Sequence, residues 1–452
     1  MVWARLRYNR LVKGRKIKFN YMGLTRDNVC YFARGYLAGK DQLIGISEKD
    51  RRNHVYVVGK TGMGKSTLLE NMLISDIQKG AGVGLVDPHG DLAQKVLSFV
   101  PSHRVNQVVY VNPADLDWPL SFNILENKDR EFNHLVASSL VSVFKKTWVD
   151  SWGPRLEHIL RNTMLALLEC PQNTLLGASK ILVDKRYRGK VIKHLKDPVV
   201  KSFWLDEFDN YPDRFLREVI SPLQNKLGAL ISNRPIRNII GQFKSLLDIE
   251  SAINSGKILI VNLSKGLVGE DASKLLGTMI VTKIQLAAMA RAKAREEERK
   301  DFILYIDEFH NFSTESFVDI LSEARKYRLS LILAHQYLNQ LEPAIKNAVL
   351  GNAGTMIAFR LGAEDGRELE SEFQPEYGWL DLVNLFPYEI CYKLMKNGKV
   401  LRPYMAESLP PYPLDSQFNN EEKIISYSRQ RYCRPREQVE KQIASWLEKP
   451  HL

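Results

Sequence analysis

A strand-to-helix turn between Val57 and Glu70 constrains this sequence more than any other stretch. It reads VVGKTGMGKSTLLE, so an apolar run enters a glycine-rich turn with GxxxxGK[ST] spacing and leaves it as a helix. Glycines let the backbone wrap closely around a phosphate, and the positive end of the following helix adds to the field of the inward N–H groups. The spacing therefore predicts a nucleotide-phosphate site made of Gly59, Lys60, Thr61, Gly62, Met63, Gly64, Lys65, Ser66 and Thr67.

Two side chains of this turn would carry the chemistry. Lys65 is expected to reach the β- and γ-phosphates of ATP, and the Ser66 hydroxyl is expected to ligate Mg²⁺, with Thr67 beside it in the first helical turn. An incidental glycine-rich turn is the alternative. The apolar strand before the turn and the helix after it favour the nucleotide site.

A second strand end supplies a pair of carboxylates. Phe302 to Ile306 (FILYI) is a run of apolar residues typical of a buried strand, and Asp307 and Glu308 follow it directly. This is the pattern of a Walker B motif. Asp307 would hold the Mg²⁺ that Ser66 also binds, and Glu308 would orient or deprotonate the attacking water.

Two more strand ends carry candidate site residues. Val83 to Val86 ends in Asp87-Pro88-His89-Gly90-Asp91, which predicts Asp87 near the bound phosphates or their metal, because ligands gather at the carboxyl ends of parallel strands. A turn built from Asp, Pro and Gly is the alternative. Leu329 to Ala334 ends in His335-Gln336, and Gln336 is our candidate for sensing the γ-phosphate.

An arginine that completes another subunit's site is also expected. Arg325 lies at the end of a predicted helix that has left the strand edge, so it is better placed to reach a neighbour's nucleotide than its own. Arg360, after the strand Thr355 to Phe359, is the rival for this role. Either residue could instead form a surface salt bridge.

Composition limits the class of protein. A chain of 452 residues with 44% hydrophobic residues can fold a large nucleotide-binding domain and smaller ones beside it. No run of about 18 apolar residues is present and the N-terminus has no signal-peptide pattern, so we expect no unaided membrane span. The four cysteines form no CxxC pair, which indicates reduced cytosolic thiols rather than a metal site.

The net charge of +12 is concentrated at the N-terminus. Residues 1–40 hold ten Lys and Arg against one Asp, and Ala4 to Tyr8 and Ile17 to Tyr21 alternate apolar and polar residues as short strands do. The basic side chains would contact nucleic acid phosphates or anionic lipid headgroups, or would simply face solvent.

The middle of the chain has a different pattern. Strands are predicted at Gln107 to Val111 and Pro119 to Leu125, after which apolar residues recur at helical spacing throughout 128–250. This predicts an all-helical insertion. Its most basic part, Lys185 to Lys190, is predicted as a loop that contacts DNA, and a solvated helix face is the alternative.

The motifs together carry a resemblance to a known family. GKTGMGKSTLL, LVDPHGDLA, WGPRLEHILRN, LYIDEFHNF, EARKYRLSL and AHQ, in this order, resemble the HerA/FtsK superfamily of hexameric DNA-pumping ATPases. Within it, the order and the insertion are similar to TraG/TraD-type coupling proteins of type IV secretion, without their usual transmembrane helices. The resemblance implies Lys65 and Ser66 at the nucleotide, Asp307 and Glu308 as Walker B, Asp87 as an auxiliary acid, Gln336 as sensor and Arg325 as the trans arginine.

We therefore expect an α/β fold, with a RecA-like P-loop ATPase sheet, an all-helical insertion and a small basic β-rich N-terminal module. The expected division is 1–43 for the basic module, 44–127 and 251–403 for the ATPase domain, 128–250 for the insertion, and 404–452 for a Pro-rich linker and helical tail. We expect the tail to lie on a neighbouring subunit, although its arginines could also contact DNA or remain solvated.

The expected function is a ring-shaped DNA translocase, a homo-hexamer using ATP and Mg²⁺. Its partners would be DNA and membrane-bound secretion or DNA-processing proteins, in the cytoplasm or peripheral at the inner face of the membrane. Alternatives are a HerA-like helicase, a secretion ATPase for pilus assembly or protein export, and a nucleotide-dependent switch. Glu308 and a trans arginine favour a motor, because a switch does not need fast hydrolysis.

Overall fold

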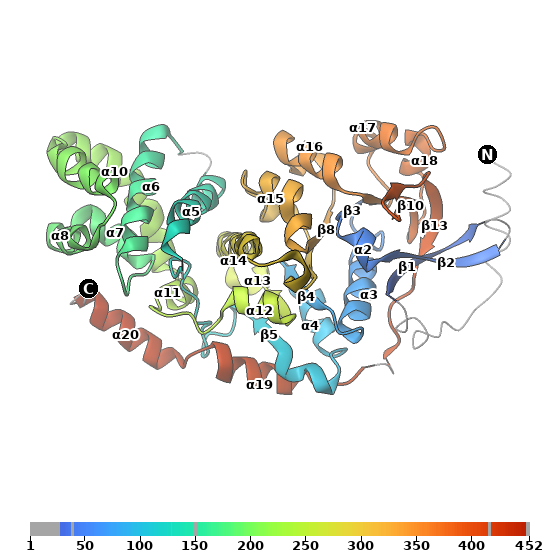
Figure 1. Cartoon of the computed structure of the whole chain (residues 1–452), viewed down its shortest axis with the longest axis horizontal. Helices are drawn as coiled ribbons and strands as arrows, with labels where there is room; N and C mark the ends of the chain where they lie inside the picture. The colour runs from blue at the N-terminus through green and yellow to red at the C-terminus, as the bar shows by residue number, and fades with distance from the viewer. Residues whose placement is uncertain (1–27, 38–39, 128, 149–151, 415–416, 449–452) are drawn as a thin grey trace.

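One sheet of eleven strands organises the part of the chain that the structure describes (Figure 1). This structure is a computed structural model, and it describes residues 28–37, 40–127, 129–148, 152–414 and 417–448. The strand order is β2-β1-β13-β10-β9-β3-β8-β7-β4-β6-β5. The strands are β1 (Val29–Leu37), β2 (Lys40–Ser47), β3 (Val55–Val58), β4 (Gly82–Asp87), β5 (Val108–Val111), β6 (Ile258–Asn262), β7 (Phe302–Ile306), β8 (Leu329–His335), β9 (Thr355–Ala358), β10 (Glu389–Lys393) and β13 (Tyr404–Ser408).

The strands from β9 to β5 are parallel, and β10, β13, β1 and β2 extend the sheet in antiparallel fashion. Every residue of β3, β4, β7 and β8 is buried, as expected for parallel strands that are covered on both faces. The carboxyl ends of β3, β8 and β7 therefore meet at one edge of the sheet, which positions the residues that follow these three strands.

Helices cover both faces of the sheet and divide the buried apolar side chains into two cores. Val55 and Val57 point into a core with α3, α4 and β1, whereas Tyr56 and Val58 point into the opposite core, as the alternation of a strand requires. The core that contains Tyr56 and Val58 continues into α14 and the helical insertion. The helices around the sheet are α2 (Glu48–Arg51), α3 (Lys65–Gln78), α4 (Asp91–Leu97), α12 (Ile249–Ser255), α13 (Lys265–Val268), α14 (Glu270–Ala290), α15 (Phe317–Glu323), α16 (Pro343–Asn352), α17 (Ala363–Phe373) and α18 (Trp379–Val383).

The helical insertion stands beside the sheet as a separate group of helices (Figure 1). Its longest helices are amphipathic. Helices α6, α9 and α11 each have Pro in the first turn, where it is favourable because the N–H that proline lacks would have no partner there. The predicted RecA-like α/β fold with a helical insertion is confirmed. The insertion contains α5 (Asn133–Thr147), α6 (Pro154–Glu169), α7 (Leu176–Val183), α8 (Lys185–His194), α9 (Pro198–Ser202), α10 (Asp213–Ser232) and α11 (Arg234–Ile240).

The N-terminal part differs from the expected separate module. β1 and β2 form a hairpin that joins the main sheet through β13, so the predicted boundary at 43/44 falls inside β2. The predicted strands Ala4 to Tyr8 and Ile17 to Tyr21, and most of the basic cluster, lie outside the described residues.

The segment Pro119 to Leu125 does not continue the sheet, and that prediction is wrong. It makes one isolated bridge, between Leu120 and Cys433, and pairs irregularly with residues 243–246. Ser121 Oγ donates to the Lys244 carbonyl over 2.6 Å, and the Leu246 N–H donates to the Ser121 carbonyl over 3.1 Å. The two chain segments that lead into and out of the insertion therefore bind each other instead of extending the sheet.

The basic stretch Lys185 to Lys190 is helical, so the alternative of a helix describes it and the predicted loop is wrong. The Asp184 carboxylate caps α8 by accepting from the N–H groups of Arg186 and Tyr187. Tyr187 and Arg188 are buried, and Arg188 pairs with Asp209 over 2.8 Å. Tyr187 and Arg188 of this basic stretch thus stabilise the insertion itself.

The C-terminal segment lies on its own chain, so the prediction that it covers a neighbouring subunit is wrong. Tyr404 to Ser408 is β13, inside the sheet rather than in a linker. Helices α19 (Glu421–Tyr432) and α20 (Arg436–Glu448) then run from the sheet edge to the insertion (Figure 1). α19 packs on β5, where Ser428 Oγ accepts from the Tyr110 N–H, and α20 packs on α11, where Glu440 pairs with Arg234 over 2.7 Å.

Among the described residues, one helix is long and apolar enough to cross a membrane, Glu270–Lys293, and 72% of its most apolar window is buried inside the protein. It includes α14, which packs against α5 and α12.

Candidate functional site

The turn after β3 has the backbone of a phosphate-binding loop. Gly59 passes so close to Phe359 that a Cβ on Gly59 would lie 2.5 Å from the Phe359 Cβ. Gly64 has a φ of 116° and is the N-cap of α3, a conformation that other residues rarely adopt. The N-terminus of α3 therefore points its free N–H groups toward the loop, as anion binding requires.

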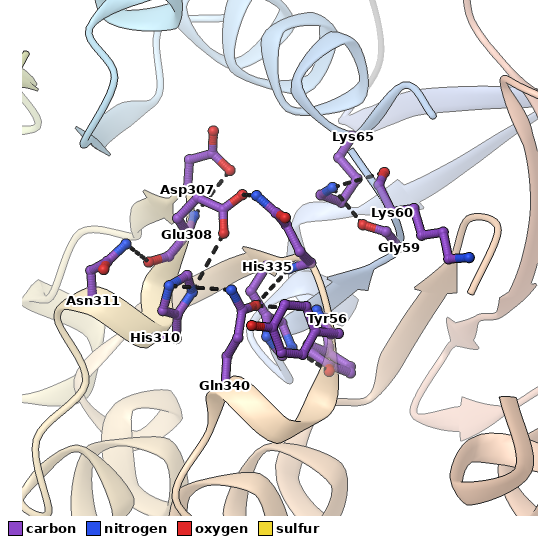
Figure 2. A network of polar contacts seen from close by, with 12 residues as sticks. Tyr56, Gly59, Lys60, Lys65, Asp307, Glu308, His310, Asn311, His335 and Gln340 are labelled. Carbon is purple, nitrogen blue, oxygen red and sulfur yellow. Dashed lines mark hydrogen bonds and ion pairs between the residues drawn. The ribbon is translucent and has the colours of Figure 1, made fainter. Parts of the chain in front are cut away.

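Lys65 lies within this loop and close to the acidic pair. Its Nζ donates to the Gly59 carbonyl over 2.5 Å and to the Lys60 carbonyl over 3.2 Å, and the residue is buried. Burial lowers the pKa of Lys65, and the charges of Glu308 and Asp307 act in the opposite direction. The ammonium group thus faces both carboxylates across the loop (Figure 2).

Asp307 directly follows β7 and lies beside the end of the neighbouring strand β4. Its N–H donates to the Val86 carbonyl over 3.1 Å, and its Oδ1 accepts from the Glu308 N–H over 3.0 Å. Burial, together with the nearby charges of Glu308 and Asp87, raises the pKa of Asp307 to about 7, although the charge of Lys65 acts in the opposite direction. The site therefore concentrates negative charge where a cation would be stabilised.

The donor set fits Mg²⁺. Ser66 is exposed in the first turn of α3, and a hydroxyl and a carboxylate are hard oxygen ligands. The described residues contain no group of three His, Cys, Asp or Glu that could hold a metal alone. One or two protein ligands completed by phosphate and water are usual for Mg²⁺.

The carboxylate of Glu308 has a side chain on each side. Its backbone is left-handed, with φ 47° and ψ 49°, which turns the carboxylate away from the strand. Its Oε1 accepts from Gln336 Nε2 over 2.9 Å, so the residues that follow β7 and β8 are joined. Its Oε2 lies 3.4 Å from Nδ1 of His310, on the other side of the carboxylate (Figure 2).

Asp87 is close to Asp307 but already bonded. Its Oδ1 accepts from the His89 N–H and its Oδ2 from the Ala93 N–H, both over 2.9 Å. These bonds shape the turn into α4, so the alternative prediction of a structural turn describes this carboxylate well. Its charge nevertheless contributes to the raised pKa of Asp307.

The two arginine candidates lie in different places. Arg325 is exposed in the 3₁₀ turn Ala324–Tyr327 and lines a pocket of about 400 Å³ with His54, which precedes β3. It is therefore at the opposite end of β3 from the phosphate loop, roughly 13 Å of strand away. Arg360 is beside the loop: its carbonyl accepts from the Lys60 N–H over 2.9 Å, but its Nε donates to the Leu385 carbonyl over 2.6 Å.

Comparison with known proteins agrees with this geometry. The family model of the helicase HerA central domain matches residues 35–284, which is more than half of the chain. The chain belongs to the HerA central-domain family. The family match includes the phosphate loop, the turn at Asp87 and the helical insertion.

Other relatives of this HerA-family chain are coupling proteins. It is 24% identical over 417 residues to the type 4 coupling protein DotL of Legionella pneumophila subsp. pneumophila, with 76% of this chain and 52% of DotL covered. The chain thus spans about half the length of this curated relative.

Solved structures share the fold. The bacterial conjugative coupling protein TrwB, without its first residues, has a TM-score of 0.60 at 14% identity, over 85% of this chain and 90% of that chain. VirB4 of Thermoanaerobacter pseudethanolicus has a TM-score of 0.55 at 15% identity, over 86% and 99%.

Several residues of the site have no signal in the sequence of this HerA-family chain. His310 lies between Glu308 and Gln340, and buried His335 contacts Tyr56, whose hydroxyl is 2.6 Å from His335 Nε2. Burial lowers the pKa of His310 to about 4 and that of His335 to about 3, so both rings are neutral at pH 7. Only folding brings His310 to Gln340 and His335 to Tyr56, because these partners are 30 and 279 positions apart in the chain.

Proposed function

We propose that this chain is an Mg²⁺-dependent ATPase that moves DNA as the motor of a coupling-type system. The observation that carries the ATPase proposal is the meeting of Lys65, Asp307 and Glu308 at one sheet edge, with Gln336 bonded to Glu308. Phosphoryl transfer depends mostly on positioning and charge stabilisation, and these are the groups it needs.

Each residue has a proposed role. The loop from Gly59 to Thr67 binds the phosphates, and Lys65 stabilises charge on the β- and γ-phosphoryl oxygens. Ser66 and Asp307 would hold Mg²⁺, which neutralises the charge that develops on the phosphates. Glu308 orients the attacking water and accepts its proton, and Gln336 senses the γ-phosphate through Glu308. Asp87 supports Asp307 from the neighbouring turn.

DNA as the transported substrate is supported by the relatives. DotL is a type 4 coupling protein and TrwB is a conjugative coupling protein, and the net charge of +12 favours a polyanionic partner. A secretion ATPase for pilus assembly or protein export is the second candidate, and the fold shared with VirB4 supports it. Membrane-bound secretion proteins are proposed partners of either motor, at the inner face of the membrane.

A ring, proposed as a homo-hexamer, would explain the position of Arg325. This exposed guanidinium is far from its own phosphate loop, so it can complete only a neighbour's site. Arg360 remains the rival, although its Nε is bonded within its own chain.

ATP turnover measured with and without double-stranded and single-stranded DNA tests the proposal. We expect Mg²⁺-dependent hydrolysis in the wild type, its loss in Glu308→Gln, and stimulation by DNA. Hydrolysis that DNA leaves unchanged would favour the secretion ATPase. Tight ATP binding with no turnover under any condition would instead indicate a switch.

A further inference from the structure

Glu308 has a second neighbour that the proposed chemistry does not use. Gln336 occupies Oε1, whereas Oε2 is buried without a hydrogen-bond partner among the described residues. The atom facing it at 3.4 Å is Nδ1 of His310, which is also buried without a partner in the described chain. An unpaired buried carboxylate oxygen is costly unless a donor completes it.

The tautomer of His310 can be derived from its other side. Gln340 Oε1 accepts from the N–H groups of Gln336 and Tyr337, over 3.2 Å each, which fixes the orientation of the Gln340 amide. Gln340 Nε2 therefore faces His310 Nε2, 3.4 Å away. An amide nitrogen can only donate, so His310 Nε2 must be the acceptor and the ring proton of the neutral imidazole sits on Nδ1.

We propose that His310 is a positioning residue that presents an Nδ1–H to Oε2 of Glu308, and that Gln340 sets this tautomer. The carboxylate is then fixed by Gln336 on one oxygen and by His310 on the other. Figure 2 shows the imidazole between Glu308 and Gln340.

The support for this ring is rigid. Leu338, within the same turn as Gln340, donates its N–H to Asp365 Oδ1 over 3.0 Å. Asn311, one residue after His310, donates from Nδ2 to the Glu308 carbonyl over 3.1 Å. His310 and Glu308 are therefore held at a fixed distance in one short turn, and the residues after β8 control the tautomer from outside it. A misplaced Glu308 would slow the chemical step without weakening nucleotide binding.

The inference rests on the proposed ATPase, and three variants of the full chain test it. His310→Ala removes the donor, His310→Asn keeps an N–H near the position of Nδ1, and Gln340→Glu keeps the acceptor for the two backbone N–H groups but withdraws the donor to Nε2. In Gln340→Glu the ring proton should move to Nε2, so Nδ1 can no longer donate to Glu308. The matched controls are His103→Asn and Gln94→Glu, at two exposed positions.

At about pH 8, where an ordinary histidine is neutral, we expect His310→Ala and Gln340→Glu to lower kcat by about 10- to 100-fold with KM changed less than about twofold. His310→Asn should recover part of the loss, and both controls should match the wild type. An effect on KM alone, or a wild-type kcat in His310→Ala, would overturn the positioning role.

The ¹⁵N spectrum of histidine-labelled protein gives a readout that needs no turnover. The signals lost in His310→Asn identify His310, and we expect a protonated Nδ1 in the wild type and a protonated Nε2 in Gln340→Glu. A wild-type ring protonated on Nε2 would overturn the inference whether or not ATP is hydrolysed. Absence of hydrolysis in the wild type would overturn the proposed function, and the spectrum would still decide the tautomer.

Discussion

Gln336 donates a hydrogen bond from Nε2 to Oε1 of Glu308 over 2.9 Å, which joins the residue after β8 to the turn after β7. The two residues are 28 positions apart in the chain and follow the ends of adjacent parallel strands. The tip of β8 is therefore in direct contact with the carboxylate proposed to orient water.

Binding and hydrolysis should separate in two variants. Lys65→Ala removes a phosphate contact, so we expect weaker ATP binding and loss of turnover. Glu308→Gln keeps the shape and can still accept from Gln336, but it loses the basic carboxylate, so ATP should bind while kcat falls by about 100-fold or more. Fluorescent nucleotide titration and single-turnover hydrolysis measure the two effects. Wild-type turnover in Glu308→Gln would show that the Walker B assignment is wrong.

Turnover should depend on assembly. If Arg325 acts on a neighbour's nucleotide, an isolated subunit lacks a charge that typically contributes about 10³-fold in rate. Specific activity should then rise with protein concentration. A mixture of Arg325→Ala and Lys65→Ala subunits should regain part of the activity, because some interfaces pair an intact Lys65 with an intact Arg325.

The control for that mixture uses the other arginine. Rescue found only with Arg360→Ala in place of Arg325→Ala would assign the trans role to Arg360. If neither mixture recovers activity and turnover is independent of concentration, the ring mechanism is excluded.

The N-terminal charge should strengthen DNA binding without sequence preference. Neutralising the basic residues should weaken binding to any DNA and flatten its salt dependence, because each phosphate contact releases counterions. Fluorescence anisotropy across a salt series measures the slope. An unchanged slope would exclude DNA as the target of this charge, and flotation with anionic liposomes would then test lipid. The residues to change are Arg5, Arg7, Arg10, Lys13, Arg15 and Lys16.

Stability should fall in mildly acidic solution because of His54. Its Nδ1 accepts from the Leu331 N–H and its Nε2 lies 3.2 Å from the Leu321 carbonyl, so the ring must stay neutral in the fold. Burial lowers its pKa from 6.5 to about 4, so the unfolded chain binds the extra proton between these values. The stability that the neutral His54 ring gives to the fold is complete above pH 6.5 and is lost as the pH falls toward about 4.

Urea unfolding across that window measures the effect. The free energy of unfolding should fall with a slope of up to about 1.4 kcal/mol per pH unit from this group. His54→Gln should reduce the slope, whereas His103→Gln, at an exposed position, should not. Equal slopes in the wild type and His54→Gln would contradict the burial effect.

The local chemistry of the site could be predicted from the sequence. A phosphate loop is one continuous segment of strand, turn and helix. Backbone geometry alone requires glycine at positions 59 and 64 of this loop. The position of Asp307 was also predictable from local sequence. The apolar run before it must form a buried strand, so the residue after that strand must lie at the edge of the sheet. The RecA-like fold was predictable for this reason, since parallel buried strands and amphipathic helices have distinct periods.

The features that only the tertiary structure decided are those whose contacts come from residues distant in the chain. β13 has a weak strand pattern and is held by pairing with β1 and β10, so the sequence placed it in a linker. The C-terminal helices lie on their own chain because β5 and α11 offer surfaces that no local pattern reveals. The same holds for His310: its role depends on Gln340, 30 residues away, and a hydrogen bond between side chains leaves no periodic signal in either segment.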